Sequence, residues 1–234
     1  SSNGWLPVPG WIADNDWKGI IPFEELPRSI NPQNGYIVTA NNKIVGSEYP
    51  YYLALDYAPE YRAKRILERI KDLNSATVED MLDVHAERTS IPASVYMRFL
   101  TKIKPKHSLE SEAVRILEDW DLKMDPESVA ATIYSAFRLK LHVKLLNNIF
   151  GPLSAKAFGS GGRGAPSHIN HLCVRFVTGA QANDTSLLPE GENWADVIAI
   201  AFSEGINYLS ETLGSNTDKW QWGVVHKTRP THPL

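Results

Sequence analysis

The sequence predicts an α+β fold that is mostly helical, and three observations lead to this expectation. Pro or Gly occurs every few positions in residues 1–50, and this spacing breaks helices and leaves loops and short strands. Within this part, residues 36–39 are β-branched or aromatic, as strand residues commonly are. From about residue 59 to residue 213, apolar residues recur at spacings of three and four, which indicates amphipathic helices.

The amino-acid composition limits the classes of molecule that this chain is expected to bind. The chain has 234 residues, enough to bury a substantial core, with 43% hydrophobic and 22% charged residues. Its formal net charge of −3 gives no basic field for nucleic acid or a membrane surface. No stretch approaches the ~18 uninterrupted apolar residues of a membrane-spanning helix. The single cysteine excludes an intramolecular disulfide and a multi-cysteine zinc site. We therefore expect neither nucleic acid nor a membrane as a partner.

The strand-forming signals lie around an asparagine turn. Residues 36–39 follow Asn34-Gly35 and form the clearest predicted strand. Asn41-Asn42 comes next, a pair that tolerates left-handed backbone and commonly marks a turn. Residues 43–45 are then expected to return as a second strand.

Helix start and stop signals divide the segment that follows. Residues 77–80 (Thr-Val-Glu-Asp) form a capping box, and Gly214 is a C-terminal cap. The expected helices begin near Pro59, after the capping box, at Pro92, after Ser108 and at Asp125 (running to about Phe150), and resume over residues 166–178 and 194–213. Residues 222–226 are then expected to form a closing strand.

Three further sequence features are not expected to form a metal, phosphate-binding or catalytic site. His168 and His171 are three residues apart, but no third ligand lies nearby to complete a zinc site. The glycine-rich residues 159–164 lack the Lys-Ser/Thr ending of a phosphate-binding loop and follow a helix, so an interhelical loop is expected. Cys173 lies in an apolar run with no activating partner, which is typical of an inert core thiol.

Ser1 leaves two interpretations open. A serine at a chain's N-terminus can be a nucleophile, with its own α-amino group as the base, because that amine titrates near neutrality. The alternative is that Ser1 marks a fragment boundary. Physical chemistry alone does not choose between them.

A dense block of motifs resembles the penicillin acylase (penicillin amidase) family of N-terminal-nucleophile hydrolases. The block consists of residues 6–11 (Leu-Pro-Val-Pro-Gly-Trp), 17–27 (Trp-Lys-Gly-Ile-Ile-Pro-Phe-Glu-Glu-Leu-Pro) and 31–42 (Asn-Pro-Gln-Asn-Gly-Tyr-Ile-Val-Thr-Ala-Asn-Asn). The resemblance continues at residues 49–51, 61–66, 80–81, 220–223 and 232–234. The helices from about 90 to 215 follow the order expected for the family but carry no motif that identifies it by itself.

The resemblance implies an architecture. In this family a precursor cleaves itself, and the first residue of the β chain, usually Ser, becomes the nucleophile. The motifs resemble the middle of the β chain, so Ser1 is expected to be a fragment boundary and the nucleophile to lie in another segment. The fold implied is part of a four-layer αββα hydrolase, in which residues 1–58 belong to the core, 59–213 form a helical domain and 214–234 return to the core as a strand.

Two functional residues follow from the resemblance. Asn41 falls where the family has its oxyanion-hole amide, and Arg62 resembles the active-site arginine that supports the oxyanion region and substrate orientation. The alternatives are a purely structural turn asparagine and a surface helical arginine. Arg65 is the neighbour most easily confused with Arg62.

The implied activity is hydrolysis of a linear carboxamide, nominally penicillin to a carboxylic acid and 6-aminopenicillanate. The alternatives are an acyl-homoserine-lactone or cephalosporin acylase, and a catalytically inactive helical module that only binds its partner segments. The expected partners are the α chain, the rest of the β chain and a small acyl amide substrate. The resemblance also implies a periplasmic or secreted protein.

No cofactor is expected for this chain. Several members of the family bind calcium, partly through a backbone carbonyl that corresponds to Gly4. The acidic ligand expected shortly after the asparagine turn has no clear counterpart, because Asp56 comes late. No complete calcium site, and no metal ligand, is assigned here.

Overall fold

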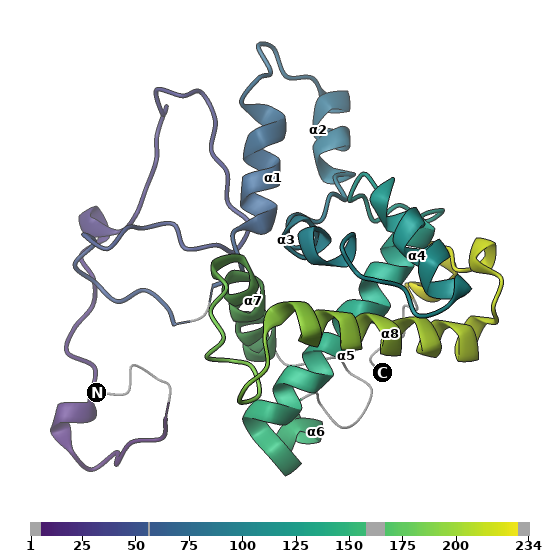
Figure 1. Cartoon of the computed structure of the whole chain (residues 1–234). Coiled ribbons are helices and arrows are strands. Elements are labelled where there is room, and N and C mark those ends of the chain that lie inside the picture. Colours follow the sequence, from purple (N-terminus) through teal and green to yellow (C-terminus); the bar gives the residue numbers. More distant parts are fainter. Residues whose placement is uncertain (1–5, 56, 158–166, 229–234) are drawn as a thin grey trace, which may run out of the picture. The chain divides into compact units, whose positions relative to one another are not determined.

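The structure is a computed structural model that describes residues 6–55, 57–157 and 167–228 (Figure 1). The chain divides into two compact units, Ser1–Glu87 and Arg88–Leu234. The first two helices of the predicted helical domain therefore group with the N-terminal segment. The predicted assignment of residues 1–58 and 214–234 to a hydrolase core stays a prediction.

The first unit is a long irregular segment followed by two helices. The segment contains two short 3-10 turns, Ala13–Asn15 and Phe23–Glu25, and leads into α1 (Tyr61–Ile70) and α2 (Val78–His85). The capping box at the start of α2 is confirmed, because the Thr77 hydroxyl accepts from the Asp80 amide and the Asp80 carboxylate accepts from the Thr77 amide, at 3.2 and 2.8 Å. The Thr77 side chain thus satisfies the Asp80 amide, one of the donors in the first turn of α2 that have no partner within the helix.

The two strands predicted in this unit are absent from the described residues. Residues 36–39 and 43–45 lie outside any strand, and the β pairing that the described residues contain is an isolated bridge between Thr89 and Lys123. A strand is stable only when a neighbouring segment takes up its backbone hydrogen bonds, and no described segment does so here. The helical part of the predicted class is confirmed; its β part is not found among residues 6–55, 57–157 and 167–228.

The second unit is a bundle of helices. They are α3 (Ile91–Leu100), α4 (Ser108–Glu118), α5 (Val129–Phe150), α6 (Ser154–Ala157), α7 (Ser167–Ala182), α8 (Trp194–Leu213) and α9 (Trp222–Val225). The long helices α5 and α8 cross at its centre (Figure 1) and bury aromatic and aliphatic side chains, among them Tyr134, Phe137, Phe202 and Ile206. Among the described residues, no helix has the length and apolar character needed to cross a membrane.

Helices α4 and α5 begin at other residues than the sequence predicts. The N-cap of α4 is His107, whose Nδ1 accepts from the Glu110 amide, and Ser108 is the first helical residue. Helix α5 begins at Val129, because the Ser128 hydroxyl accepts from the Ala131 amide at 3.1 Å. The end of α8 is as predicted, with Gly214 at φ +84°.

The predicted closing strand at residues 222–226 is wrong. Trp222–Val225 form the short helix α9 instead. The amides of Trp222 and Gly223 donate to the carbonyls of Ser128 and Pro126, at 3.1 and 2.7 Å. These bonds tie the segment to the start of α5, so tertiary contacts override the β preference of Val224 and Val225.

A buried carboxylate joins α4 to α8. Glu110 is 1% exposed; one of its oxygens accepts from the Ser203 hydroxyl at 2.6 Å and the other from the Lys106 amide at 2.7 Å. Burial raises the pKa of Glu110, but these hydrogen bonds and the nearby His107 and Lys106 together lower it by more, so the net pKa lies below its usual value. The ionised form is therefore the one that stabilises the fold.

Replacing Glu110 by Gln is expected to lower the free energy of unfolding by about 1–3 kcal/mol at neutral pH, because a charged acceptor is lost in a buried position. Since the folded pKa is depressed, the stabilisation by Glu110 is present at neutral pH and is lost as the pH falls through that pKa. Urea unfolding at several pH values should show the two proteins converging in acid. The exposed Glu118→Gln is the matched control on the same helix; a gap between Glu110→Gln and the unsubstituted protein that does not shrink in acid would contradict the prediction.

Candidate active site

The Asn41 turn precedes α1 in the chain and follows residues 36–39, which have no regular secondary structure. Asn41 has a left-handed backbone with φ +61°, a conformation that asparagine tolerates better than most residues. Its carbonyl accepts from the Ala58 amide at 2.7 Å, which ties the turn to the residues just before α1. Ala40 beside it is buried, whereas the Asn41 side chain is exposed. The turn therefore presents an amide to solvent from a fixed backbone.

Arg62 lies in the first turn of α1 and contacts this turn directly. Its Nη2 donates to the Ala40 carbonyl at 2.8 Å and to Oδ1 of Asn41 at 3.0 Å. The structure therefore brings together the two residues that the sequence singled out. Because 21 positions separate them in the chain, this contact is a product of the fold.

The contact with Arg62 fixes which way the Asn41 amide faces. A guanidinium only donates hydrogen bonds, so the atom that faces Arg62 must be the amide oxygen. The Nδ2 group of Asn41 is then turned away, and it has no acceptor among the described residues. The pair thus presents an exposed N–H donor of defined orientation.

Comparison with known proteins gives the turn a context. The model of the penicillin amidase family matches residues 1–234. The chain belongs to the penicillin amidase family. This confirms the resemblance carried by the motifs of the first 42 residues.

The relatives of this chain are named after two kinds of substrate, penicillins and acyl-homoserine lactones. The chain is 35% identical to a penicillin acylase 2 proenzyme from a Pseudomonas species. The matched region covers 99% of the chain and 29% of that protein. It is 24% identical to the acyl-homoserine lactone acylase QuiP of Pseudomonas aeruginosa over 95% of the chain and 28% of that protein. It is also 57% identical to penicillin G acylase of Escherichia coli over 37 residues, 16% of the chain and 4% of that protein. The chain thus spans less than a third of the length of these relatives.

Arg65, the other arginine of the family-like motif, has a different environment. Its guanidinium forms ion pairs with Glu68 and Glu87, the latter at 2.8 Å. Burial lowers the pKa of Arg65, but these carboxylates outweigh it and raise the pKa overall. Arg65 therefore ties α1 to Glu87 after α2, and Arg62 is the arginine that contacts the Asn41 turn.

Sequence reasoning did not single out Asn42 or Ala58. The Asn42 side chain accepts from the Ala40 amide at 3.0 Å and donates to the Lys43 carbonyl at 3.1 Å. The doubled asparagine was the one signal available for Asn42, and the motif offered none for Ala58, which acts through its backbone.

Of the remaining candidates, Cys173 lies among the described residues, and its thiol is not activated. Burial raises the pKa of the Cys173 thiol to about 11, against a smaller lowering by Arg138, so the thiolate is scarce at neutral pH. Backbone atoms of His168 and His171 lie in α7, but their side chains are outside what the structure describes. The predictions for Ser1, Gly4, Asp56, residues 159–164 and residues 232–234 also lie outside the described residues. In the part of the chain that is described, no cluster of three metal-ligating side chains occurs.

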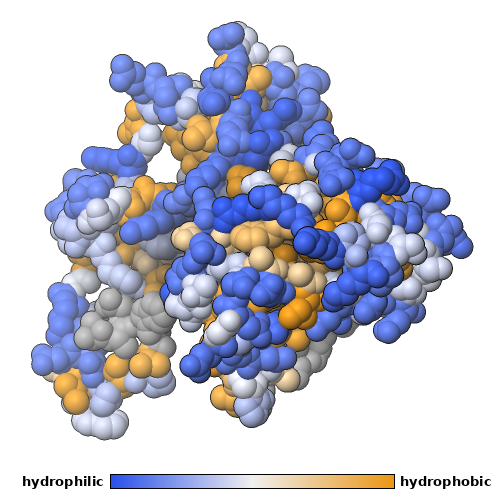
Figure 2. Space-filling view, in the orientation of Figure 1, coloured by the Kyte–Doolittle hydropathy of each residue, from blue (hydrophilic) through white to orange (hydrophobic). Residues whose placement is uncertain are grey.

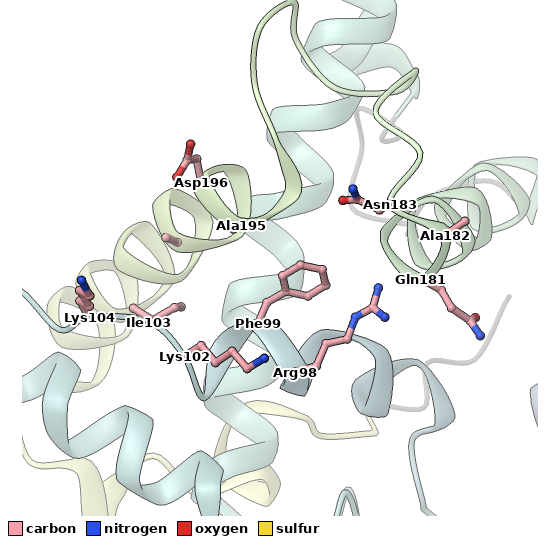
Figure 3. Close-up of a pocket in the computed structure, with 11 residues that line it drawn as sticks. Arg98, Phe99, Lys102, Ile103, Lys104, Gln181, Ala182, Asn183, Ala195 and Asp196 are labelled. Carbon is pink, nitrogen blue, oxygen red and sulfur yellow. The ribbon is translucent and has the colours of Figure 1, made fainter.

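The second unit has a groove of about 620 Å³ where α3, α7 and α8 meet (Figure 3). Basic and apolar side chains line it, including Arg98, Lys102 and Phe99, with Asp196 on the α8 side. The Arg98 guanidinium donates to the Ala180 carbonyl near the end of α7 and lies over the Phe99 ring. It therefore connects α3 to the C-terminal end of α7. None of the predicted site residues lines this groove.

Proposed function

We propose that this chain supplies the oxyanion-binding part of an amidohydrolase that cleaves linear carboxamides. The observation that carries the proposal is the Arg62–Asn41 contact, which turns the Asn41 N–H group outward from a tied turn. A fixed amide N–H aimed at a developing oxyanion stabilises a tetrahedral intermediate more than it stabilises the substrate. The family membership of the chain supports the same chemistry.

The proposed reaction is acyl transfer through a serine at the start of the β chain, in another segment of the protein. The serine hydroxyl attacks the amide carbon, and its proton passes through the α-amino group of the same residue to the leaving amine. The carbonyl oxygen becomes the oxyanion and accepts from Nδ2 of Asn41. Water then hydrolyses the acyl-enzyme to release a carboxylic acid and restore the serine.

Penicillins and related acylated amines are the proposed substrates, because penicillin acylase 2 proenzyme is similar over almost the whole chain. A second candidate is an acyl-homoserine lactone, since the QuiP acylase is also similar over 95% of the chain, at lower identity. Both substrates carry a linear amide, so the Asn41 turn serves either one.

A substrate panel tests the proposal on the full-length protein. We expect turnover of penicillin G and a chromogenic phenylacetyl anilide, detected as released 6-aminopenicillanate and aniline. A higher kcat/KM for long-chain acyl-homoserine lactones would favour the second candidate. No release of amine from any member of the panel would contradict the amidohydrolase proposal.

Arg62→Lys is expected to lower kcat by roughly tenfold to a hundredfold with a small change in KM. Lysine keeps the charge, but its shorter and freely rotating side chain does not hold an N–H donor in the fixed place between the Ala40 carbonyl and Oδ1 of Asn41 that the rigid guanidinium gives Nη2. Loss of that contact frees the Asn41 amide to rotate, and small misplacements of catalytic groups cost up to ~10²-fold. Arg65→Lys is the control on the same helix, and steady-state kinetics should show it near the unsubstituted rate. Equal effects of the two variants would exclude a specific role for Arg62.

We further propose that the first unit packs against other segments of its own precursor. Large apolar side chains are exposed along it, with Trp11 at 87%, Trp17 at 95% and Ile20 at 95%, and hydrophobic atoms of this segment lie at the surface in Figure 2. Exposure of so many large side chains is typical of a surface that another part of the protein covers. The relatives are more than three times as long as the matched region, which leaves ample chain for this role.

A further inference from the structure

The side chain of Asn42 closes the turn around Asn41 from the other side. Its Oδ1 accepts from the amide of Ala40 at 3.0 Å, the residue before Asn41. Its Nδ2 donates to the Lys43 carbonyl at 3.1 Å, so both ends of the side-chain amide are used. The Asn42 side chain is half-buried, in contrast to that of Asn41. Asn42 therefore bridges the two residues on either side of the Asn41–Asn42 pair.

The Asn42 bridge lies at a residue whose backbone conformation is unfavourable in free energy. Asn41 has φ +61°, in a region that L-residues seldom adopt, and such conformations persist where the surroundings impose them. Three contacts impose it here: Ala40 to Asn42, Ala58 to the Asn41 carbonyl, and Arg62 to the Ala40 carbonyl. Arg62 orients the Asn41 side chain, whereas Asn42 holds the backbone from which that side chain extends.

We infer that Asn42 is a positioning residue for the Asn41 amide, and this rests on the proposed role of Asn41 as oxyanion donor. Both ends of the Asn42 side-chain amide bond the backbone of the turn, Oδ1 to the Ala40 amide and Nδ2 to the Lys43 carbonyl, so its orientation is set within the turn. Its effect on catalysis therefore passes through Asn41. A residue that acts in this way changes kcat and leaves substrate binding almost unchanged.

Two substitutions in the full-length protein grade the effect. Asn42→Ala removes the bridge and is expected to lower kcat by about tenfold to a hundredfold, in line with the cost of a small misplacement. Asn42→Ser keeps a side-chain oxygen that closes such turns more weakly, so its kcat should lie between that of Asn42→Ala and that of the unsubstituted protein. KM should stay within about twofold for both, since no substrate contact is removed. Asn34→Ala, at an exposed turn asparagine of the same unit, is the matched control and should keep the unsubstituted kcat.

A double-mutant cycle separates positioning from a general structural role. If Asn42 acts through Asn41, adding Asn42→Ala to Asn41→Ala should change kcat no further, because the amide to be positioned is already absent. Thermal unfolding of each variant reports whether the unit stays folded. If Asn42→Ala does not fold, the Asn42→Ser variant carries the same cycle.

The outcomes distinguish the inference from the proposed function. A normal kcat in Asn41→Ala overturns the proposed oxyanion donor and the inference with it. A low kcat in Asn41→Ala together with a normal kcat in Asn42→Ala overturns the inference alone. A loss from Asn42→Ala that is equally large in the Asn41→Ala background also overturns it, because that loss does not depend on the amide.

Discussion

Asn41→Ala in the full-length protein is expected to lower kcat by about 10²- to 10³-fold, the effect of removing one oxyanion-hole donor, or about 2.7–4 kcal/mol of transition-state stabilisation. KM should change little, because the bond to the oxyanion is stronger in the tetrahedral state than in the substrate. The exposed side chain of Asn41 packs against little, so unfolding should shift by much less than the rate does. Steady-state kinetics with a chromogenic anilide, alongside thermal unfolding, provide the measurement.

Two further variants isolate the donor. Asn41→Asp keeps the oxygen that accepts from Arg62 but replaces the N–H group with a second oxygen, so it should lose activity at least as severely. Asn31→Ala is the control, because Asn31 is also exposed and also has positive φ, at 47°, and it should remain active. An Asn41→Asp enzyme with near-normal kcat would rule out the proposed donor.

The sequence predicted the helices well because their signals are local. The capping box at Thr77 and Gly214 at the end of α8 each act within one turn of their own helix, so their effect does not depend on distant residues. Where a distant contact decides, the prediction failed. Residues 222–226 have strand-forming side chains, yet the carbonyls of Pro126 and Ser128 hold Trp222 and Gly223 in a helical turn.

The candidate site shows the same division. The motif resemblance pointed to Asn41 and Arg62 separately, but no sequence pattern states that one nitrogen of Arg62 lies between the Ala40 carbonyl and Oδ1 of Asn41. That contact depends on how α1 meets the turn. The strand at residues 36–39 could not be judged from composition either, because a strand needs a neighbour and the described residues supply none.

Gly205→Val is expected to lower the free energy of unfolding of the helical unit by about 3 kcal/mol or more, at the upper end of the cost of overpacking a core. Gly205 lies on α8 where it crosses α5. A Cβ at this position would be 2.9 Å from the backbone nitrogen of Phe137 and 3.1 Å from its Cα. Backbone atoms of a helix cannot turn aside as a flexible side chain can, so the two helices must separate.

Separation of α5 from α8 would loosen the aromatic core, because Phe137 packs edge-on against Tyr96 of α3 with ring centroids 5.4 Å apart. Asn207→Val is the matched control. It places the same β-branched residue on an exposed position of α8, so it measures the helix-propensity cost alone, which is a fraction of a kcal/mol. Urea unfolding followed by far-UV circular dichroism measures both variants. Equal stability of the two would mean that the crossing has room for a side chain, and that α5 and α8 do not pack backbone to backbone at Gly205.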